Sequence, residues 1–477
     1  MNLSRYWQQA GGYGETIRLA FPLILSTSAW SLQHFIDRMF LAWYSPAAIA
    51  ASMPAGFLEF TIASLFIGTT SYISTFVAQY YGANQYEQIG KIIWQGLFFS
   101  LFAMVIILAW LPFAGLLFRL AGHAPEIQRL EQQYFVVLIA GGGFPIAAAA
   151  LSSFFSGRGD VWTVMWVNVI ATVVNIGLDY LLIFGKYGLP ELGMRGAAVA
   201  TVMSAVVSFA LFMGLMLRAK FRRQYHTWSG RKFDAHMFRR LLYFGLPGGA
   251  HSFLDCLGFA LFILLVGRYG AEALAATNIA FNINTLAFMP MFGFGIAVSV
   301  IVGQRLGENN PTLAERSTWS AAHLTFLYML ILSVLYVVVP GLFLHPFGKQ
   351  ATVVSFQPIY NYGVILLRFV ALYSLFDAMN IVFSAAIKGA GDTRFVMFIS
   401  VTLSWIVMVI PTFLATIIFH WSLFVSWSFA TAYVVLLGLI FLVRFLQGKW
   451  KSMRVIEESS HVISVLLPEK PTPEMEI

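Results

Sequence analysis

Residues 43–52, WYSPAAIAAS, recur 225 positions later as RYGAEALAAT at 268–277. At the same offset, FVAQYYGANQ (76–85) recurs as IVGQRLGENN (301–310) without a gap. Between residues 44 and 85, eleven positions are identical in the two copies, more than even a biased composition would produce by chance. The chain therefore contains an internal duplication, and its fold must place the two copies in equivalent positions.

The composition places both copies in a membrane. Of the 477 residues, 59% are apolar and only 10% are charged, whereas a soluble chain carries roughly 25% charged residues. Such a chain cannot cover its surface with polar groups in water, which excludes a soluble globular enzyme, a disordered protein and a collagen-like protein. The single cysteine, Cys256, excludes an intramolecular disulfide and a cysteine-cluster metal site.

Apolar stretches that are broken by polar, Gly or Pro clusters predict an all-α membrane protein with twelve transmembrane helices. Roughly 20 predominantly apolar residues are enough to cross a bilayer as a helix. The first stretch is not a cleavable signal peptide, because its apolar core continues without a small-residue cleavage site. The predicted spans are 15–43, 49–80, 90–119, 133–156, 162–184, 195–219, 241–268, 273–305, 318–345, 358–387, 393–418 and 422–447.

The distribution of basic residues predicts the orientation in the membrane. An even number of spans puts both termini on one side, and Lys and Arg favour the cytoplasmic side. Cytoplasmic termini leave 21 bases inside and six outside, with Arg38 and Arg368 within spans. We therefore expect a multi-pass protein of the plasma (bacterial inner) membrane. The basic segment 221–240 is open to a nucleic-acid or lipid-binding interpretation, but a linker that sets topology and touches anionic headgroups explains it more simply, so no nucleic acid is expected.

Two more matches extend the repeat to whole halves of the chain. Pro22 aligns with Pro247 at the first offset, and GRGD (157–160) aligns with GAGD (389–392) at an offset of 232. Two halves of six helices that share one orientation can enclose a central cavity and rock against each other, as in secondary transporters. We predict an N-lobe at 1–219, a basic cytoplasmic linker at 220–240, a C-lobe at 241–447 and a cytoplasmic tail at 448–477.

Five acids lie within the predicted spans: Asp37, Glu59, Asp179, Asp255 and Asp377. An ionised carboxylate at the bilayer centre costs at least about 2.5–3.5 kcal/mol on insertion scales, so it persists mainly where a function or a partner requires it. Because only two bases oppose the acids there, we expect them to face a hydrated cavity that attracts H⁺, Na⁺ or organic cations. The alternative is that each acid is a structural hydrogen-bonding group between helices.

Spacing adds a neutral partner to three of these acids. Gln33 precedes Asp37, Asn175 precedes Asp179 and Tyr373 precedes Asp377 by four residues, which is one helix face. Clusters rich in oxygen can hold a proton or a desolvated Na⁺. Gln33 and Glu59 are further candidates for polar groups of the cavity, whereas Asp160 and Asp392 at span ends are expected to cap helices.

No motif for catalysis or for cofactor binding is found. His34 and His251 lie within spans without a ligand pattern at metal spacing, so packing is the simpler interpretation. GAGDT (389–393) lacks the preceding strand and the following Lys of a phosphate-binding loop. We expect no enzymatic activity and no cofactor, with transport energy drawn from an ion gradient.

The motifs resemble those of the multidrug and toxic compound extrusion (MATE) transporters, most nearly the NorM-like branch, over nearly the whole chain to about residue 447. The resemblance rests on Asp37 followed by SPAAIAA, and on LPGGAHSFLD (246–255), GRYGAEALAATNIAFNINTLAFMP (267–290), YSLFD (373–377) and KGAGDTR (388–394). It implies two six-helix lobes around a V-shaped cavity, and export of cationic, often aromatic compounds against H⁺ or Na⁺.

The resemblance also implies site residues. The N-lobe ion site would comprise Asp37, Asn175, Asp179 and Thr201, the C-lobe site Asp255, Tyr373 and Asp377, and Pro22 would be a hinge. Na⁺ or H⁺ would bind at these residues. Asp255 stands where the NorM-like pattern usually carries Glu, which puts a complete Na⁺ site in the C-lobe in doubt, and Glu59 lies outside the pattern.

These features predict a monomeric antiporter in which ion and organic cation compete for the same buried charge. Two alternatives remain. A lipid-linked saccharide flippase of the same superfamily would need a cationic cavity, which five acids against two bases disfavour. A membrane receptor or transferase is disfavoured by the repeat and by the missing catalytic motif.

Overall fold

The computed structural model describes residues 7–348 and 353–457, and every regular element within these ranges is a helix. The first half contains α2 (Tyr13–Tyr44), α3 (Pro46–Ser71), α4 (Ile73–Gly82), α5 (Tyr86–Leu108), α6 (Ala114–Ala121), α7 (Pro125–Gly141), α8 (Gly143–Gly157), α9 (Val161–Phe184), α10 (Met194–Met216) and α11 (Ala219–Gln224). The second half contains α12 (Ala235–Val266), α13 (Ala271–Gly307), α14 (Pro311–Val338), α15 (Pro340–Gly348), α16 (Val353–Ala390), α17 (Thr393–Leu403), α18 (Ile410–Phe413) and α19 (Leu423–Leu446). Of the predicted tail, residues 458–477 lie outside the described residues.

Ten described helical segments are long and apolar enough to cross a bilayer, and the bent pair α7 and α8 makes an eleventh. The remaining long helix is α2, which has 32 residues. Its apolarity is lower because Gln33, His34, Asp37 and Arg38 lie close together in its second half. These helices form the predicted all-α membrane fold of twelve spans in two pseudo-symmetric lobes.

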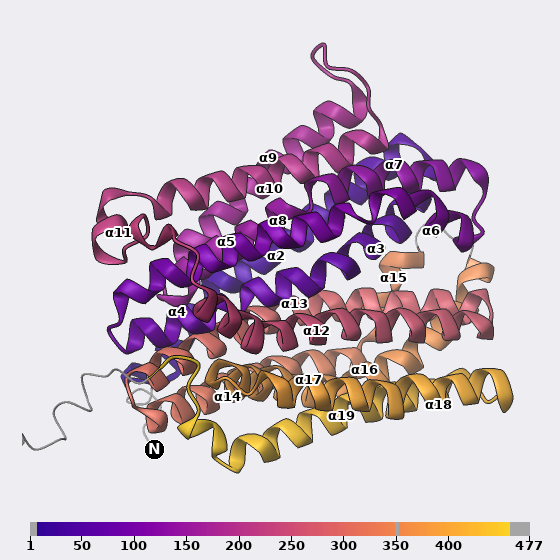
Figure 1. Cartoon of the computed structure of the whole chain (residues 1–477). Helices are drawn as coiled ribbons and strands as arrows, with labels where there is room; N and C mark the ends of the chain where they lie inside the picture. The colour runs from indigo at the N-terminus through magenta and orange to yellow at the C-terminus, as the bar shows by residue number, and fades with distance from the viewer. Residues whose placement is uncertain (1–6, 349–352, 458–477) are drawn as a thin grey trace, which may run out of the picture.

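The buried apolar side chains fall into two large clusters, one for each lobe. The first comes mainly from α2 to α10, and the second from α12 to α19. In Figure 1 the indigo and magenta helices lie over the orange and yellow helices, and α4 and α11 share one end of the molecule. We call this end, where Trp7 and Glu457 lie, the terminal side, and the opposite end the open side.

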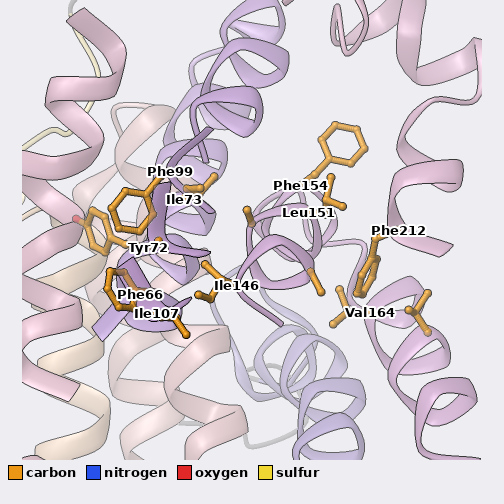
Figure 2. Packing of buried hydrophobic residues seen from close by; sticks show 14 of the residues in the cluster. Phe66, Tyr72, Ile73, Phe99, Ile107, Ile146, Leu151, Phe154, Val164 and Phe212 are labelled. Carbon is orange, nitrogen blue, oxygen red and sulfur yellow. The ribbon is translucent and has the colours of Figure 1, made fainter. Parts of the chain in front are cut away.

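The N-lobe core is packed around α8 (Figure 2). Ile146 and Leu151 of α8 are fully buried, with Ile73 of α4 and Val164 of α9 among their neighbours in the cluster. Gly96 of α5 allows the close approach, because a Cβ there would lie 2.2 Å from Ile73 Cδ1. Such close packing holds the helices that carry the N-lobe acids in fixed positions.

Two spans are interrupted where the sequence weakens the helix. The α7–α8 span bends by 42° within the sequence GGGFP (141–145), where three glycines and a proline lower helix stability. The span Thr393–Ile418 contains two π-helical segments, Ser404–Val409 and Leu414–Ile418. π-Helical turns often occur at functional sites, and the first one begins next to the C-lobe acids.

The basic linker packs as an ordered layer on the terminal end of α5. Trp94 Nε1 donates to the carbonyl of Thr227 over 2.7 Å. Gln95 donates to the carbonyl of Lys232 over 3.1 Å and accepts from the Asp234 amide over 3.2 Å. The linker thus covers the terminal side of the N-lobe.

The repeats meet in a reciprocal contact between the lobes. Gln79 on α4 donates from Nε2 to the carbonyl of Gly389 over 3.0 Å, and its repeat counterpart Gln304 on α13 donates to the carbonyl of Gly157 over 2.8 Å. Gly157 and Gly389 are the first residues of the GRGD and GAGD motifs. The residues that are identical between the halves therefore close the terminal side in a pseudo-twofold pair.

Glycine is required where α4 and α13 cross. A Cβ on Gly82 would lie 2.0 Å from the carbonyl oxygen of Gln304, and a Cβ on Gly307 would lie 2.2 Å from that of Gln79. No other residue fits in this arrangement without a shift of backbone. The two glycines, which are also repeat counterparts, allow the lobes to touch.

The lobes touch near the terminal side and part toward the open side. On α2 and α13, Thr27 Oγ1 donates to the carbonyl of Met289 over 3.1 Å, and Gly293 lies against the backbone of Ile24. The same helix faces continue toward the open side with Phe35, which is 66% exposed, and Leu286, which is 72% exposed. The contact faces are therefore uncovered beyond the middle of the molecule.

Helices α3 and α12 diverge in the same way. A Cβ on Gly249 would lie 2.0 Å from the carbonyl oxygen of Leu65, so the two helices touch there. Further along the same face of α3, Met53 and Phe57 are exposed. We call the space between these uncovered faces of α2, α3, α12 and α13 the vestibule.

Candidate ion-coupling sites

The N-lobe site joins acids from two helices. The Asp37 carboxyl on α2 and the Asp179 carboxyl on α9 are within hydrogen-bonding distance of one another. Asn175, one turn before Asp179, donates from its amide nitrogen to Asp179 Oδ2 over 3.1 Å and to Asp37 Oδ1 over 2.9 Å. Asn175 and Asp179 are fully buried, and Asp37 is 3% exposed.

This geometry can take up one positive charge. A carboxylate oxygen only accepts hydrogen bonds, so two carboxyl groups bond to each other only when one of them holds a proton. Among the described residues no group of three or more His, Cys, Asp or Glu is placed to hold a metal ion. A Na⁺ at the pair would therefore need amide and hydroxyl ligands in addition to the two acids.

Other N-lobe candidates have weaker links to the pair. Thr201 on α10 donates to the carbonyl of Ala197 over 3.0 Å, so its hydroxyl proton is used within its own helix. Gln33 is buried, but forms no hydrogen bond with Asp37 in the described structure. His34 Nδ1 lies 3.9 Å from Asp37 Oδ2. Pro22 is buried within α2, near its contact with α13.

Tyr134 on α7 is an N-lobe site residue that sequence reasoning missed. It is buried and interacts electrostatically with Asp37, Asp179 and Glu59. Because α7 is distant in sequence from α2 and α9, no spacing rule could place Tyr134 beside them. The only available signal was a polar aromatic residue within an apolar span.

The C-lobe site is centred on Asp255 and Asp377. Tyr433 on α19 donates to Asp255 Oδ1 over 3.0 Å, and Asn380 donates to Asp377 Oδ1 over 3.1 Å. Tyr433 also interacts electrostatically with Asp377. Tyr373 interacts electrostatically with Asp377, but forms no hydrogen bond with it in the described structure.

A base and a small void adjoin Asp255. Lys388, which we counted as a cytoplasmic loop base, interacts electrostatically with both Asp255 and His251. A small void between α12 and the span Thr393–Ile418 is lined by His251, Asp255, Ser400 and Ser404. The hydroxyls of Ser400 and Ser404 are buried and have no hydrogen-bond partner among the described residues. The C-lobe thus contains a base that interacts electrostatically with Asp255, although the two form no ion pair within 4.0 Å in the described structure.

The acids are divided between the lobes and differ in exposure. Asp37 and Asp179 are buried in the N-lobe and Asp377 is buried in the C-lobe, whereas Glu59 and Asp255 are partly exposed. That all five face one hydrated cavity therefore stays a prediction. Within the described residues, none of the five acids forms an ion pair with Arg or Lys within 4.0 Å.

The expected capping roles of Asp160 and Asp392 are corrected in part. Both occupy N-cap positions, of α9 and α17, but neither side chain makes a capping hydrogen bond. Asp160 Oδ1 accepts from the Thr163 hydroxyl over 2.9 Å, and Asp392 Oδ2 forms an ion pair with Arg444 at 2.6 Å. Each carboxylate thus binds a side chain instead of the backbone amides at the start of its helix.

Comparisons with known proteins agree with this architecture. The sequence profile of the MatE family matches residues 22–181 and 247–414. The probable multidrug resistance protein NorM of Thermotoga maritima is 28% identical over 458 residues, covering 93% of this chain and 94% of that protein. The multidrug resistance protein NorM of Burkholderia vietnamiensis is 30% identical over 392 residues, covering 80% and 82%.

Solved structures give the same fold. A multidrug resistance MATE family transporter of the MOP superfamily, in an outward-facing conformation, matches with a TM-score of 0.84 at 21% identity, covering 95% of this chain and 99% of that one. A MOP superfamily transporter from Pyrococcus furiosus matches equally well, with a TM-score of 0.84 at 21% identity and the same coverage. At this identity the structural match supports the fold alone.

Proposed function

Because the chain belongs to the MatE family, whose members are transporters and not enzymes, we propose that it is a multidrug efflux antiporter. It exports organic compounds, cationic and aromatic ones above all, in exchange for H⁺ or Na⁺ by alternating access. The observation that carries the proposal is the buried Asp37–Asn175–Asp179 cluster, which can take up and release one positive charge.

The ion and the cargo act on the lobes from different sides. Asp37 and Asp179 are buried within the N-lobe, and Asp377 is buried within the C-lobe. The exposed Phe35, Met53 and Leu286 lie on the vestibule faces. Binding of an ion between Asp37 and Asp179 changes how α2 packs against α9. Pro22 lacks the amide hydrogen for a helical bond, so it weakens α2 next to the contact with α13, where a hinge would couple the site to the lobes. Cargo and ion therefore compete through the shape of α2 and of the vestibule wall.

The vestibule walls favour flat cations as cargo. Aromatic and methionine side chains bind such cations by stacking and cation–π contact. Arg38 is exposed on α2 in this region, and it is one base among largely apolar side chains. A flippase for pyrophosphate-linked saccharides would need several such bases.

The membrane and the orientation follow from the charge distribution. Both termini and the basic linker are proposed to face the cytoplasm of a plasma (bacterial inner) membrane, since 21 bases lie on that side and six on the other. The vestibule then opens outward. All residues of both ion sites come from one chain, so a monomer is sufficient for transport.

The test is efflux of ethidium from cells that lack their own pumps, with H⁺ and Na⁺ gradients collapsed separately. Wild-type protein is expected to lose efflux when one of the two gradients is removed. Asp37→Asn and Asp179→Asn are expected to abolish efflux, and Asp377→Asn tests the C-lobe. Retained efflux in all three variants would overturn the assignment of the sites, and movement of a lipid-linked saccharide instead of ethidium would favour a flippase.

A further inference from the structure

Glu59 is the one ionisable side chain of α3, and the two ion sites leave it without a role. It lies near Ala55 and Ile62, which are buried, on the face of α3 that turns into the N-lobe. The opposite face carries Met53 and Phe57, which are exposed to the vestibule. The Glu59 carboxylate therefore belongs to the interior of the N-lobe.

Tyr134 packs against the face of α3 that carries Glu59 and interacts electrostatically with the acid pair. A Cβ on Gly56, which lies one turn before Glu59, would be 3.7 Å from Tyr134 Cε1, so the tyrosine ring packs against this face of α3. Tyr134 interacts electrostatically with Glu59, Asp37 and Asp179. A phenol hydroxyl can donate and accept a hydrogen bond at the same time, so Tyr134 has the chemistry to connect them.

Exposure distinguishes Glu59 from the other two acids. Asp37 is 3% exposed and Asp179 is 0% exposed, whereas Glu59 is half-buried. Part of the Glu59 side chain is therefore accessible, whereas both acids of the pair are buried. The Glu59 carboxylate forms no hydrogen bond or ion pair with any described residue.

The ionisable groups on the helices packed against α3 leave Glu59 free to exchange protons. Helix α8 has none, and those of α5 lie at the terminal side. On α7, Glu131 is held by His123 Nδ1 at 2.7 Å. Glu126 and Arg129 are exposed at the start of α7. The other groups are Tyr134 on α7, His34, Asp37 and Arg38 on the nearby part of α2, and His251, Asp255 and Cys256 on α12.

We propose that Glu59 is a third acid of the N-lobe ion site and exchanges protons between water and the Asp37–Asp179 pair through Tyr134. A protonated Glu59 donates its proton to the Tyr134 oxygen, while the original Tyr134 O–H proton passes to a carboxylate of the pair. Glu59 is left ionised and Tyr134 neutral. This inference rests on the proposed function, with H⁺ as the coupling ion.

The test uses purified full-length protein in liposomes, with ethidium movement driven by an imposed pH gradient. Glu59→Gln and Tyr134→Phe are expected to slow transport at least about ten-fold, as the loss of a positioned proton-transfer group does. The KM for ethidium should stay within about two-fold of wild type, because neither side chain faces the cargo. Glu59→Asp should restore most of the rate and shift its pH profile.

Controls separate the possible failures. Glu126→Gln removes an exposed acid from the same lobe and is expected to leave rate and pH profile unchanged. If wild-type protein moves no ethidium with the pH gradient, the proposed function fails. If wild-type transport is proton-driven and both Glu59→Gln and Tyr134→Phe match its rate and pH profile, the role of Glu59 is refuted while the function stands.

A different observation concerns the segment after α19, Lys449–Glu457, which we call the strap. Trp450 is buried in the C-lobe core, whereas Val455 and Ile456 are buried in the N-lobe core. The strap therefore connects the two cores across the terminal side.

Polar contacts fix both ends of the strap. Lys451 Nζ forms an ion pair with Glu315 on α14 at 2.7 Å. At the other end, the Val455 amide donates to Gln79 Oε1 over 2.8 Å, and Glu457 forms an ion pair with Arg240 on α12 at 2.7 Å. Gln79 thus contacts the C-lobe motif and the strap together, whereas no equivalent of the strap contacts its counterpart Gln304 within residues 7–348 and 353–457.

We infer that the strap is a latch that holds the terminal side closed. Alternating access requires α4 to move away from the C-lobe on this side. The Val455 end of the strap must then leave Gln79 and the N-lobe core, while the Lys451 end stays on the C-lobe. Fixing the Val455 end to α4 should stop the transport cycle.

A reversible cross-link tests the latch in a Cys256→Ser background. Tyr80→Cys and Glu457→Cys place thiols on α4 and on the strap, at residues that interact electrostatically. Treatment with a bis-methanethiosulfonate reagent is expected to abolish ethidium transport, and a reductant should restore it. The control pair Glu315→Cys and Lys451→Cys cross-links the strap within one lobe, so transport should continue.

Each outcome is decisive, because every variant is compared with itself before treatment. Full transport after complete cross-linking of the Tyr80→Cys and Glu457→Cys pair would overturn the latch. Equal loss with the control pair would show that the strap moves as a whole and would overturn the fixed end at Lys451. A chain that ends at Gly448 should spend less time open to the outside, measured by thiol labelling at Phe35→Cys.

Discussion

Asn175 is the residue that makes a single site out of two acids. It lies one turn from Asp179 on α9, yet its amide also bonds Asp37 on α2. Without a donor between them, two buried carboxyl groups would be left with poorly satisfied oxygen atoms. The helix spacing predicted that Asn175 and Asp179 lie together, because i and i+4 neighbours share a face whatever the tertiary fold. It could not predict the bond to Asp37, which lies on another helix.

Asn175→Leu is therefore expected to lower stability and to weaken ion coupling. Two buried acceptors lose their donor, and each loss costs about 1–3 kcal/mol. The measurement is thermal unfolding in detergent, together with the pH dependence of ethidium transport. Asn168→Leu is the matched control, since Asn168 on the same helix donates to the neutral Ser26 hydroxyl. If both variants show equal loss of stability and coupling, the bridging role of Asn175 is contradicted.

Gly307 offers a second test at this scale. Gly307→Ala places a methyl group about where a Cβ would lie 2.2 Å from Gln79 O, and overpacking of this kind costs about 1–3 kcal/mol. The cost applies only when the terminal side is closed, so the variant should favour the opposite state. Thiol labelling of Phe35→Cys from outside should fall, whereas Gly214→Ala, with open space around it, should leave labelling unchanged.

The remaining site residues show what sequence reasoning could not reach. Asp255 and Asp377 were recognisable as acids within apolar spans, but Tyr433 and Lys388 were not recognisable as their neighbours. Those contacts depend on which helices pack together and on how far a long side chain extends from a span end. Single-sequence spacing contains neither kind of information.

At the scale of elements, the repeat predicted more than the spans did. The identical positions Gln79 and Gln304 turned out to bond the glycines of the GRGD and GAGD motifs. The alignment at offset 225 gives the two glutamines, and the alignment at offset 232 gives the two glycines that they bond. Both alignments therefore describe one contact between the lobes. The interrupted elements were harder, since the α7–α8 bend and the π-helical segments depend on local hydrogen-bond geometry that hydropathy does not report.

The reciprocal contacts of Gln79 and Gln304 predict that the same substitution at the two positions changes the outward-open population by different amounts. Gln304→Leu removes one hydrogen bond to the other lobe, worth about 1 kcal/mol, and should shift the protein modestly away from the outward-open state. Gln79→Leu removes the bond to Gly389 and also the bond from Val455, so its shift should be larger. External labelling of Phe35→Cys measures both, and deletion of the strap should make the two variants alike.

Equal labelling in the two variants, with the strap present, would show that Val455 contributes nothing to closure. Gln95→Leu is a suitable control, because Gln95 holds the linker within the N-lobe and does not bridge the lobes. It should affect stability and leave labelling unchanged.

At the scale of the whole molecule, the two lobes contain different sets of ionisable residues, so they are expected to differ in ion coupling. The N-lobe holds a carboxyl pair and a third acid, Glu59, whereas in the C-lobe the base Lys388 interacts electrostatically with Asp255. A base in the surroundings of Asp255 competes with an added ion for that carboxyl group. The N-lobe is thus the better candidate for coupling, a distinction that the count of acids along the sequence could not make.

Alternating access itself predicts a cross-link that needs motion. Phe35 and Leu286 continue the faces on which α2 and α13 touch, yet they are 66% and 72% exposed because the lobes have parted. Rocking that opens the terminal side should bring these faces together. Phe35→Cys with Leu286→Cys, in a Cys256→Ser background, should therefore cross-link slowly at rest and faster during ethidium transport driven by an ion gradient. Asp37→Asn should remove the acceleration, and rapid cross-linking at rest, without a gradient, would contradict the outward-open ground state.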